Sequence, residues 1–231
     1  MITASMSTIA WREPGLAQAV ASILPQVDRL NVFLQGYEYT PACLDDPRVS
    51  VINGGPDSAF GASAKYHWVW DGLVVDGYHF AVDDDIEYPP DYVQRCVAKI
   101  DEYGKRAVVG FHGAVYKETV RKYFRDREVW RFDKACETNR FVHMLGTGTS
   151  AMHTSTMRLT REDFTAANSC DLFLALACQR QQVPMLCIAR PAQYLKALRT
   201  AFDPRSASAS EDYARRMVEL HGSIPEWRIY T

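Results

Sequence analysis

Apolar residues in the first part of the chain fall into short runs typical of buried strands, separated by one stretch with helical spacing. The runs predict strands over residues 2–9, 30–34 and 49–52. Between the first two strands, Glu13-Pro14-Gly15 marks the start of a helix. The apolar positions of this helix are Leu16, Val20, Ile23 and Leu24. A strand, a helix and a second strand of these lengths predict the opening of a parallel α/β sheet.

The middle of the chain predicts a strand that runs directly into a cluster of acids. A loop over 53–66 is expected to feed a helix that continues to about residue 75. Residues 77–82 then form an apolar strand, which Asp83-Asp84-Asp85 follows, and Pro89-Pro90 starts the next helix. Because open α/β sheets bind ligands beyond the C-terminal ends of their strands, the three acids lie where a ligand is expected.

From residue 114 onward the pattern changes to short, aromatic-rich segments without helix-length connections. Residues 114–145 therefore predict added antiparallel strands. A tight glycine loop over 146–150 precedes another strand, and a helix is predicted to begin near Asp171. A strand over 184–188 and a helix over 211–220 follow. The whole pattern predicts an α/β protein with a mixed, mostly parallel central sheet flanked by helices, and a small antiparallel addition.

Length, charge and cysteine usage narrow the class of protein. The 231 residues favour a single domain covering 1–231, and a formal net charge of −2 gives no field that would attract nucleic acid. The six cysteines are scattered and none lies at Cys-x-x-Cys spacing, which argues against zinc and redox motifs. No signal peptide is visible, and no apolar run approaches the ~20 residues that span a bilayer. We therefore expect a cytoplasmic protein without a transmembrane segment; peripheral association with a membrane stays open.

Three adjacent carboxylates repel one another, so the cluster at 83–85 calls for an explanation beyond the fold. A divalent cation with a phosphate-bearing ligand provides one, since hard oxygen ligands suit Mg²⁺ or Mn²⁺. A solvated acidic turn that caps the next helix is the alternative. An EF-hand loop is excluded, because Tyr88 occupies the position that requires glycine and Gln94 the position that requires glutamate. An aspartyl-phosphate phosphatase would carry its paired aspartates on the first strand instead.

Four segments follow one another in an order that resembles the glycosyltransferases of GT-A fold, most closely family-two-like bacterial sugar transferases. The segments are Gly61-Ala62-Ser63-Ala64-Lys65-Tyr66-His67-Trp68, Asp83-Asp84-Asp85-Ile86-Glu87-Tyr88-Pro89, Gly146-Thr147-Gly148-Thr149 and Asp171-Leu172. The resemblance covers about residues 1–195. It implies a nucleotide-binding half over about 1–113, an acceptor half over about 114–195, and a C-terminal loop and helix over 196–231.

The resemblance implies a donor site built around a divalent metal ion, Mn²⁺ or Mg²⁺, that bridges the diphosphate of a nucleotide-sugar. Asp85 would bind the metal, and Asp83 would contact the metal or the ribose, with Asp84 in the same site. A bound cation stabilises the negative charge that develops on a departing diphosphate. The remaining donor-site residues that the resemblance implies are Ala4, Ser5, Met6, Arg12, Asp57, Lys65 and Arg190.

On the acceptor side, Asp171 matches the position of the base that deprotonates the acceptor in inverting members of the family. The alternative is that Asp171 merely caps its helix, and Cys170 stands where the family usually has a second acid. The implied acceptor loop consists of Gly146, Thr147 and Gly148, and His112 is a candidate to face the acceptor. Many such enzymes use a C-terminal histidine as a further metal ligand; Arg190 occupies that place here, which leaves His153 and His221 as candidates.

The resemblance thus implies a metal-assisted glycosyltransferase of hexosyltransferase type, which moves a sugar from a UDP-sugar to a glycan or lipid-linked acceptor in polysaccharide biosynthesis. Two alternatives stay open. A nucleotidyltransferase shares the α/β half, but it would need a glycine-rich phosphate loop after the first strand, where Ser5-Met6-Ser7-Thr8 contains no glycine. A non-catalytic domain that binds a nucleotide-sugar would have no use for both the acid cluster and Asp171.

Overall fold

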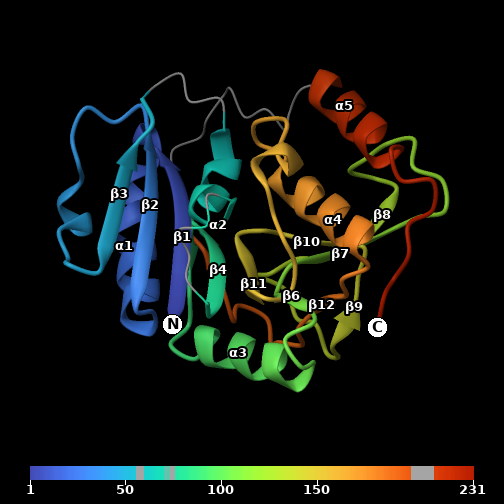
Figure 1. Cartoon of the computed structure of the whole chain (residues 1–231), viewed down its shortest axis with the longest axis horizontal. Coiled ribbons are helices and arrows are strands. Elements are labelled where there is room, and N and C mark those ends of the chain that lie inside the picture. The colour runs from blue at the N-terminus through green and yellow to red at the C-terminus, as the bar shows by residue number, and fades with distance from the viewer. Residues whose placement is uncertain (56–59, 71, 73–75, 199–210) are drawn as a thin grey trace.

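Four parallel strands form one half of an eight-stranded central sheet (Figure 1). In spatial order they are β3 (Val49–Asn53), β2 (Arg29–Gln35), β1 (Ile2–Ile9) and β4 (Tyr78–Asp83). The structure is a computed structural model that describes residues 1–55, 60–70, 72, 76–198 and 211–231. Ser7 of β1 lies beside Asp83 of β4 in the parallel register, so these two strands end at the same edge of the sheet.

Strand β11 (Thr149–His153) joins the two halves of the sheet. It runs antiparallel between β4 and β6 (Val108–Gly110), and β12 (Met185–Cys187) and the edge strand β9 (Arg140–Phe141) follow. Thr149 lies opposite Val82. The glycine loop that precedes β11 is therefore brought up against the acids that follow β4.

Two small antiparallel sheets complete the strands. The first contains β10 (Met144–Leu145), β7 (Gly113–Tyr116) and β8 (Arg127–Trp130), and the second pairs β5 (Ile86–Glu87) with β13 (Lys196–Ala197). The mixed, mostly parallel sheet with a small antiparallel addition is thereby confirmed.

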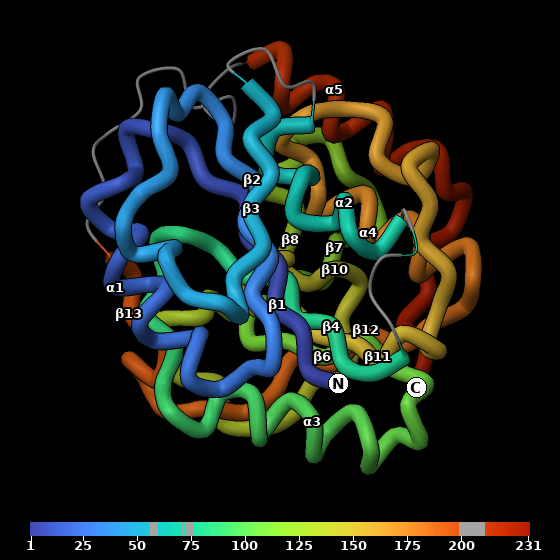
Figure 2. The backbone as a smooth tube through the Cα atoms, turned by 60° about the vertical axis from the view of Figure 1, so that its left-hand side comes forward, coloured from blue at the N-terminus to red at the C-terminus, as the bar shows by residue number. Residues whose placement is uncertain are grey.

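Helices cover both faces of the central sheet. They are α1 (Glu13–Ile23), α2 (His67–Trp70), α3 (Tyr92–Glu102), α4 (Cys170–Gln181) and α5 (Glu211–His221). Phe80 and Val82 of β4 pack in the core with α1 and α3, whereas Ala81 packs in a second core with α4. Figure 2 shows the first strands with α1 on one side and α2 and α4 on the other. Because both faces are buried, the strands read as continuous apolar runs.

The region before β4 differs from the sequence prediction. In place of one helix to about residue 75, the chain forms a 3-10 helix, η4 (Gly61–Tyr66), followed by the single turn of α2, which ends at Trp70. Residues 71 and 73–75 lie outside the described part of the chain, as do 199–210 of the expected C-terminal loop. The other 3-10 helices described are η1 (Ala10–Arg12), η2 (Leu24–Gln26), η3 (Ala42–Leu44) and η5 (Arg161–Asp163).

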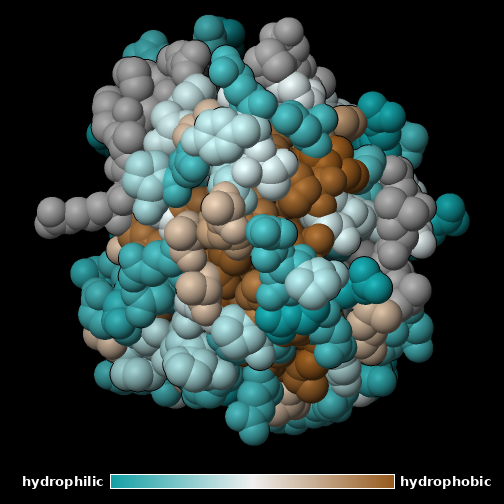
Figure 3. All heavy atoms as spheres, turned by 90° about the vertical axis from the view of Figure 1, so that its left-hand side faces the viewer, coloured by the Kyte–Doolittle hydropathy of each residue, from teal (hydrophilic) through white to brown (hydrophobic). Residues whose placement is uncertain are grey.

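The other edge strand of the described sheet, opposite β9, is β3, whose side chains Val49, Val51 and Ile52 are half-buried. The face of the molecule on this side has hydrophobic side chains near its middle with hydrophilic ones around them (Figure 3). Within the described residues, no helix is both long and apolar enough to cross a membrane.

Candidate functional site

A cleft of about 650 Å³ opens where the C-terminal ends of β1 and β4 approach the start of α4. Ser7 and Thr8 of β1, Asp83 of β4 and Asp171 of α4 all line it. This is the position at which open α/β sheets bind their ligands. The expected site at the end of β4 is therefore a real concavity of the molecule.

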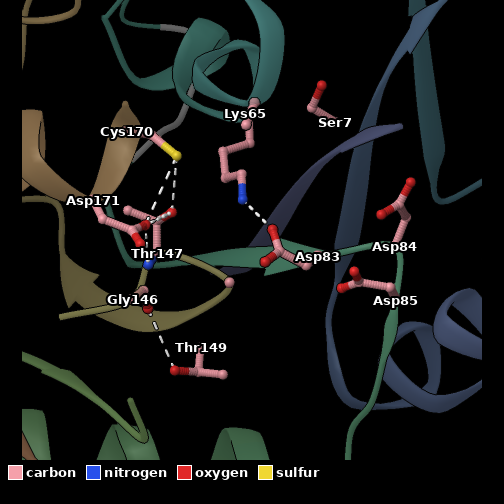
Figure 4. Close-up of polar contacts among 12 residues, drawn as sticks. Ser7, Lys65, Asp83, Asp84, Asp85, Gly146, Thr147, Thr149, Cys170 and Asp171 are labelled. Carbon is pink, nitrogen blue, oxygen red and sulfur yellow. Dashed lines mark hydrogen bonds and ion pairs between the residues drawn. The ribbon is translucent and has the colours of Figure 1, made fainter. Parts of the chain in front are cut away.

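One side of the cleft, which we call the acid wall, consists of Arg12, Lys65, Asp83, Asp84 and Asp85. The three carboxylates point in different directions. Asp83 reaches toward Lys65, whereas Asp84 and Asp85 lie together beyond it (Figure 4). Each carboxylate has a cationic partner from another part of the chain, which limits the repulsion among the three acids.

Lys65 is held in the acid wall by an ion pair with Asp83. The Lys65 side chain is only 2% exposed, while that of Asp83 is 35% exposed and faces the cleft. Burial alone would lower the pKa of Lys65, but the charge of Asp83 outweighs it, so the pKa is raised. Lys65 therefore stays protonated and places a permanent positive charge beneath the cleft.

Arg12 pairs with the other two acids, at 3.0 Å from Asp84 Oδ1 and 3.2 Å from Asp85 Oδ2. Burial raises the pKa of Asp84 against the opposing charge of Arg12. The pKa of Asp85 is raised to about 6, first by burial and then by the charges of Asp83 and Asp84. A cluster of carboxylates that is hard to ionise fully is one that an added cation would stabilise.

The acid wall fits a divalent cation held together with a phosphate ligand. Mg²⁺ is commonly bound by one or two carboxylates, with waters and substrate phosphates completing its shell. Asp83 and Asp85 are each about one-third exposed in the cleft, and the buried Oδ2 of Asp84 has no hydrogen-bond partner among the described residues. Those residues contain no group of three or more His, Cys, Asp or Glu side chains suited to a metal. The donor set thus suits a cation that the ligand helps to bind.

Asp171 begins the opposite side of the cleft, in the first turn of α4. Its Oδ1 accepts hydrogen bonds from the backbone N–H of Thr147 at 2.8 Å and from the Thr147 hydroxyl at 2.6 Å. The same hydroxyl lies 3.1 Å from the Cys170 sulfur. These contacts fix the carboxylate against the glycine loop (Figure 4). Oδ2 accepts no hydrogen bond from the described residues, so it is the oxygen open to a ligand.

The glycine loop is packed directly on the acid wall. A Cβ atom on Gly148 would overlap the Asp83 carboxylate, so a larger residue at this position would displace the Asp83 side chain from its present place. The buried hydroxyl of Tyr88 joins the two segments, because it accepts from the Asp83 N–H at 2.7 Å and donates to the Gly148 carbonyl at 2.6 Å. Tyr88 lies within the acid motif, yet its spacing gives no signal for this role.

The far side of the cleft, which we call the aromatic wall, consists of Tyr123, Phe124, Arg127 and Tyr213. The Arg127 guanidinium lies over the rings of Tyr123 and Phe124, at 4.8 and 5.1 Å from their centres. Sequence reasoning missed all four residues. Three come from the irregular segment before β8 or from β8 itself, and Tyr213 comes from α5, so no motif links them.

The structure brings most of the expected site residues together, with one shift along β1. Arg12, Lys65, the three acids, Thr147 and Asp171 line one cleft. On β1, however, the lining residues are Ser7, Thr8 and Ile9. The expected donor-site residues Ala4, Ser5 and Met6 are buried within the sheet instead. Strand β1 covers residues 2–9 as the apolar pattern predicted, but the residues that the resemblance implied lie three positions before its open end.

Seven other expected residues lie outside the cleft lining or the described structure, namely Gly146, Gly148, His112, Arg190, His153, His221 and Asp57. Arg190 is buried, and its guanidinium donates to the backbone carbonyls of residues 130–132, so these donors face the protein. His153 pairs with Tyr78 at the start of β4, at the opposite end of the strand from Asp83. His221 stacks on Trp227 with 4.7 Å between ring centres. Asp57 lies outside the described residues.

His112 lies behind the glycine loop. Its carbonyl accepts the Gly146 N–H at 2.8 Å, and a Cβ atom on Gly146 would lie 3.0 Å from the His112 Cβ. Burial lowers the pKa of His112, against the charge of Asp171, which raises it. His112 therefore supports the loop from below and is not a lining residue of the cleft.

Comparisons with known proteins identify the fold. No protein-family model and no curated protein sequence match this chain. Among solved structures, the chain is similar to GalNAc-T7, crystallised with UDP, GalNAc and Mn²⁺, with a TM-score of 0.64 at 8% sequence identity. The match covers 95% of this chain and 47% of that one, so this chain spans about half the length of the solved protein. The fold is GT-A, as expected.

Proposed function

We propose that this chain is a glycosyltransferase that transfers a sugar from a UDP-sugar to a glycan or lipid-linked acceptor. The observation that carries the proposal is the single cleft in which Asp83 and Asp85 face Asp171 beyond the C-terminal edge of the sheet. That arrangement provides a place for a nucleoside diphosphate and a base within one ligand site. GalNAc-T7, which has the same fold, was crystallised with UDP and Mn²⁺, and this supports the proposed donor and metal.

On the donor side, Asp83 and Asp85 would hold a divalent ion, which supplies Lewis-acid stabilisation of the leaving diphosphate when it is bound. Lys65 and Arg12 balance the acid wall, so the phosphates of a donor do not meet three uncompensated carboxylates. The same two cations attract the diphosphate and oppose the charge that builds on it as the sugar leaves.

On the acceptor side, Asp171 is the proposed general base of an inverting reaction. Thr147 holds Oδ1 through two hydrogen bonds, which leaves Oδ2 to accept the proton of an acceptor hydroxyl. The position of Asp171 in the first turn of α4 stabilises its negative charge.

The wider proposal keeps a single domain, with a donor half over about 1–113, an acceptor half over about 114–195 and a C-terminal part over 196–231. The acceptor belongs to polysaccharide biosynthesis of a bacterial type, and the site of action is the cytoplasm. These points rest on the resemblance of the motifs and on the site that the cleft provides.

The test is thermal unfolding in the presence of UDP with and without Mn²⁺ or Mg²⁺. A ligand at about 100 times its Kd stabilises the fold by about 2.7 kcal/mol, which raises the melting temperature of a chain of this size by roughly 5–11 °C. Asp85→Asn should remove the metal-dependent part of the shift, whereas Asp45→Asn, at an exposed loop position, should keep it. The absence of a shift with UDP, with or without metal, would contradict the proposal. UDP binding without sugar transfer or donor hydrolysis across a panel of nucleotide-sugars would favour the non-catalytic alternative.

A further inference from the structure

The aromatic wall contains a cation without a counter-ion. Arg127 has no carboxylate within 4.0 Å among the described residues, and its Nε is buried with no hydrogen-bond partner there. Arg12 and Lys65, the other cations of the cleft, are both paired with acids. Arg127 is thus the side chain of this cleft whose charge the described structure leaves uncompensated.

The setting of Arg127 makes this unpaired charge costly. The rings of Tyr123 and Phe124 pack against the guanidinium and displace part of its water, although cation–π attraction offsets part of that loss. A partly buried charged group with an unsatisfied donor is normally completed by an anion or by ordered water. The planar fork of arginine suits the two oxygens of a carboxylate or phosphate.

The location of Arg127 assigns the missing anion to the acceptor. Arg127 lines the same cleft as Asp171, and the charges of both act on Tyr213, whose pKa is raised to about 12 chiefly by burial. The donor diphosphate has its own cations in the acid wall. The aromatic wall has no part in the proposed diphosphate site, so we assign the anion that Arg127 would bind to the molecule whose hydroxyl Asp171 deprotonates.

An aromatic surface next to Arg127 can hold the rest of such an acceptor. The Phe124 side chain is 43% exposed, and its ring lies parallel to that of Tyr213, with 6.2 Å between centres and 17° between planes. The Tyr213 hydroxyl donates to the Asn168 carbonyl at 2.7 Å, which ties α5 to the loop before α4. Sugar rings pack well on fixed aromatic faces of this kind.

We propose that the acceptor is an anionic glycan, whose carboxylate or phosphate group is bound by Arg127 while a neighbouring sugar ring packs on Phe124 and Tyr213. The proposal rests on the proposed glycosyltransferase function and names the acceptor class of the same cleft. A sugar acid and a phosphate-linked sugar share the chemistry that Arg127 recognises, so the experiment must separate these two sources.

Saturation-transfer NMR on the UDP-bound protein tests the proposal with two matched pairs of small probes. Methyl glucuronide is compared with methyl glucoside, and glycerol phosphate with glycerol. We expect the charged member of at least one pair to bind about tenfold or more tightly than its neutral partner, and the responsive pair identifies the anion. Arg127→Gln should abolish this preference, and Arg127→Lys should retain part of it because the charge stays while the fork is lost.

The matched control is Arg125→Gln, which removes the same charge from an exposed position two residues away and should keep the preference. Equal binding of charged and neutral probes to the wild type would overturn the proposal. The proposal would also be overturned if Arg127→Gln kept the tighter binding of the charged probes, whether or not that variant lost UDP binding. Failure of the wild type to bind UDP would instead contradict the proposed function. The preference for charged probes tests only the acceptor class.

Discussion

The two sides of the cleft differ in how their charges are balanced. In the acid wall the negative charges are paired within the chain, because Lys65 and Arg12, from distant segments, form ion pairs with the acids at the end of β4. The aromatic wall ends in Arg127, which has no acidic partner in the described part of the protein. The described chain thus supplies a cationic partner for each carboxylate of the acid wall, but no acidic partner for Arg127.

This difference follows from where each wall is built. The acid wall lies on the parallel half of the central sheet, whose register fixes Ser7 beside Asp83 and holds the acids over a rigid base. The aromatic wall is built from three places: the irregular segment before β8, the first residue of β8, and α5. An acid wall on the sheet and an aromatic wall on connecting segments agree with the general observation that binding residues often lie on loops positioned by a fixed scaffold.

The largest expected effect is at the boundary between the walls, for Asp171→Asn. The asparagine side chain can still accept from Thr147 through its oxygen, so the loop geometry is kept, but the base is lost. We expect kcat for sugar transfer to fall by about 10²–10⁴-fold while the affinity for UDP changes little. Transfer kinetics together with UDP titration measure both quantities.

Asp212→Asn is the control for this change, because Asp212 is an exposed residue of α5. A loss of UDP affinity in Asp171→Asn, comparable to the loss of rate, would show that Asp171 acts in donor binding together with the acid wall. Unchanged transfer would reduce Asp171 to a cap of α4.

The next largest effect is on stability, and it compares Lys65 of the acid wall with Arg127 of the aromatic wall. Lys65→Met should destabilise the fold by roughly 2–3 kcal/mol, somewhat below the 3–5 kcal/mol for breaking a buried ion pair, because Asp83 keeps partial access to water. Arg127→Met removes a charge that has no carboxylate partner within the described chain, and we expect a change within about 1 kcal/mol. Urea unfolding of both variants gives the two free energies of unfolding.

Lys117→Met serves as the surface control, since Lys117 forms an exposed pair with Asp126 and such pairs contribute at most about 1 kcal/mol. Equal destabilisation by Lys65→Met and Arg127→Met would show that Arg127 is as fully satisfied by the protein as Lys65 is. The asymmetry between the walls would then be wrong.

The sequence predicted the acid wall far better than the aromatic wall, and the reason is physical. A parallel strand delivers its following residues to one edge of the sheet, so the position of Asp83, Asp84 and Asp85 could be read from an apolar run followed by acids. Lys65 and Arg12 could be predicted as site residues only from the family resemblance. Their pairing with particular acids depends on side-chain directions that periodicity does not encode.

The aromatic wall could not be predicted because its members meet through the docking of a helix and a ribbon that are far apart in sequence. Tyr123 and Tyr213 are 90 positions apart in the numbering, and neither lies in a motif with fixed spacing. For Arg190 the sequence predicted a ligand residue, because it follows the end of a strand. In the structure its guanidinium N–H groups donate to neighbouring backbone carbonyls instead. The sequence could therefore predict which edge of the sheet carries the site. Which side chains line the cleft depends on three-dimensional contacts that the sequence pattern does not show.

The smallest expected effect is at the contact that joins the acid wall to the glycine loop, the hydroxyl of Tyr88. Tyr88→Phe removes the acceptor of the Asp83 N–H and the donor to the Gly148 carbonyl, so it should cost about 1–2 kcal/mol of stability. Because the glycine loop also holds Asp171, we expect UDP affinity and kcat to fall together, by roughly tenfold or less.

Tyr92→Phe is a closely matched control, since the Tyr92 hydroxyl is buried near Tyr88 and has no hydrogen-bond partner among the described residues. Removing it should leave stability unchanged or slightly raised, because an unsatisfied polar group is replaced by an apolar one. If Tyr88→Phe also proved neutral, the glycine loop would be positioned by packing on Asp83 alone. If Tyr88→Phe lowered kcat without changing the affinity for UDP, the role of Tyr88 would be to position Asp171 through the glycine loop, and not to position Asp83 for donor binding.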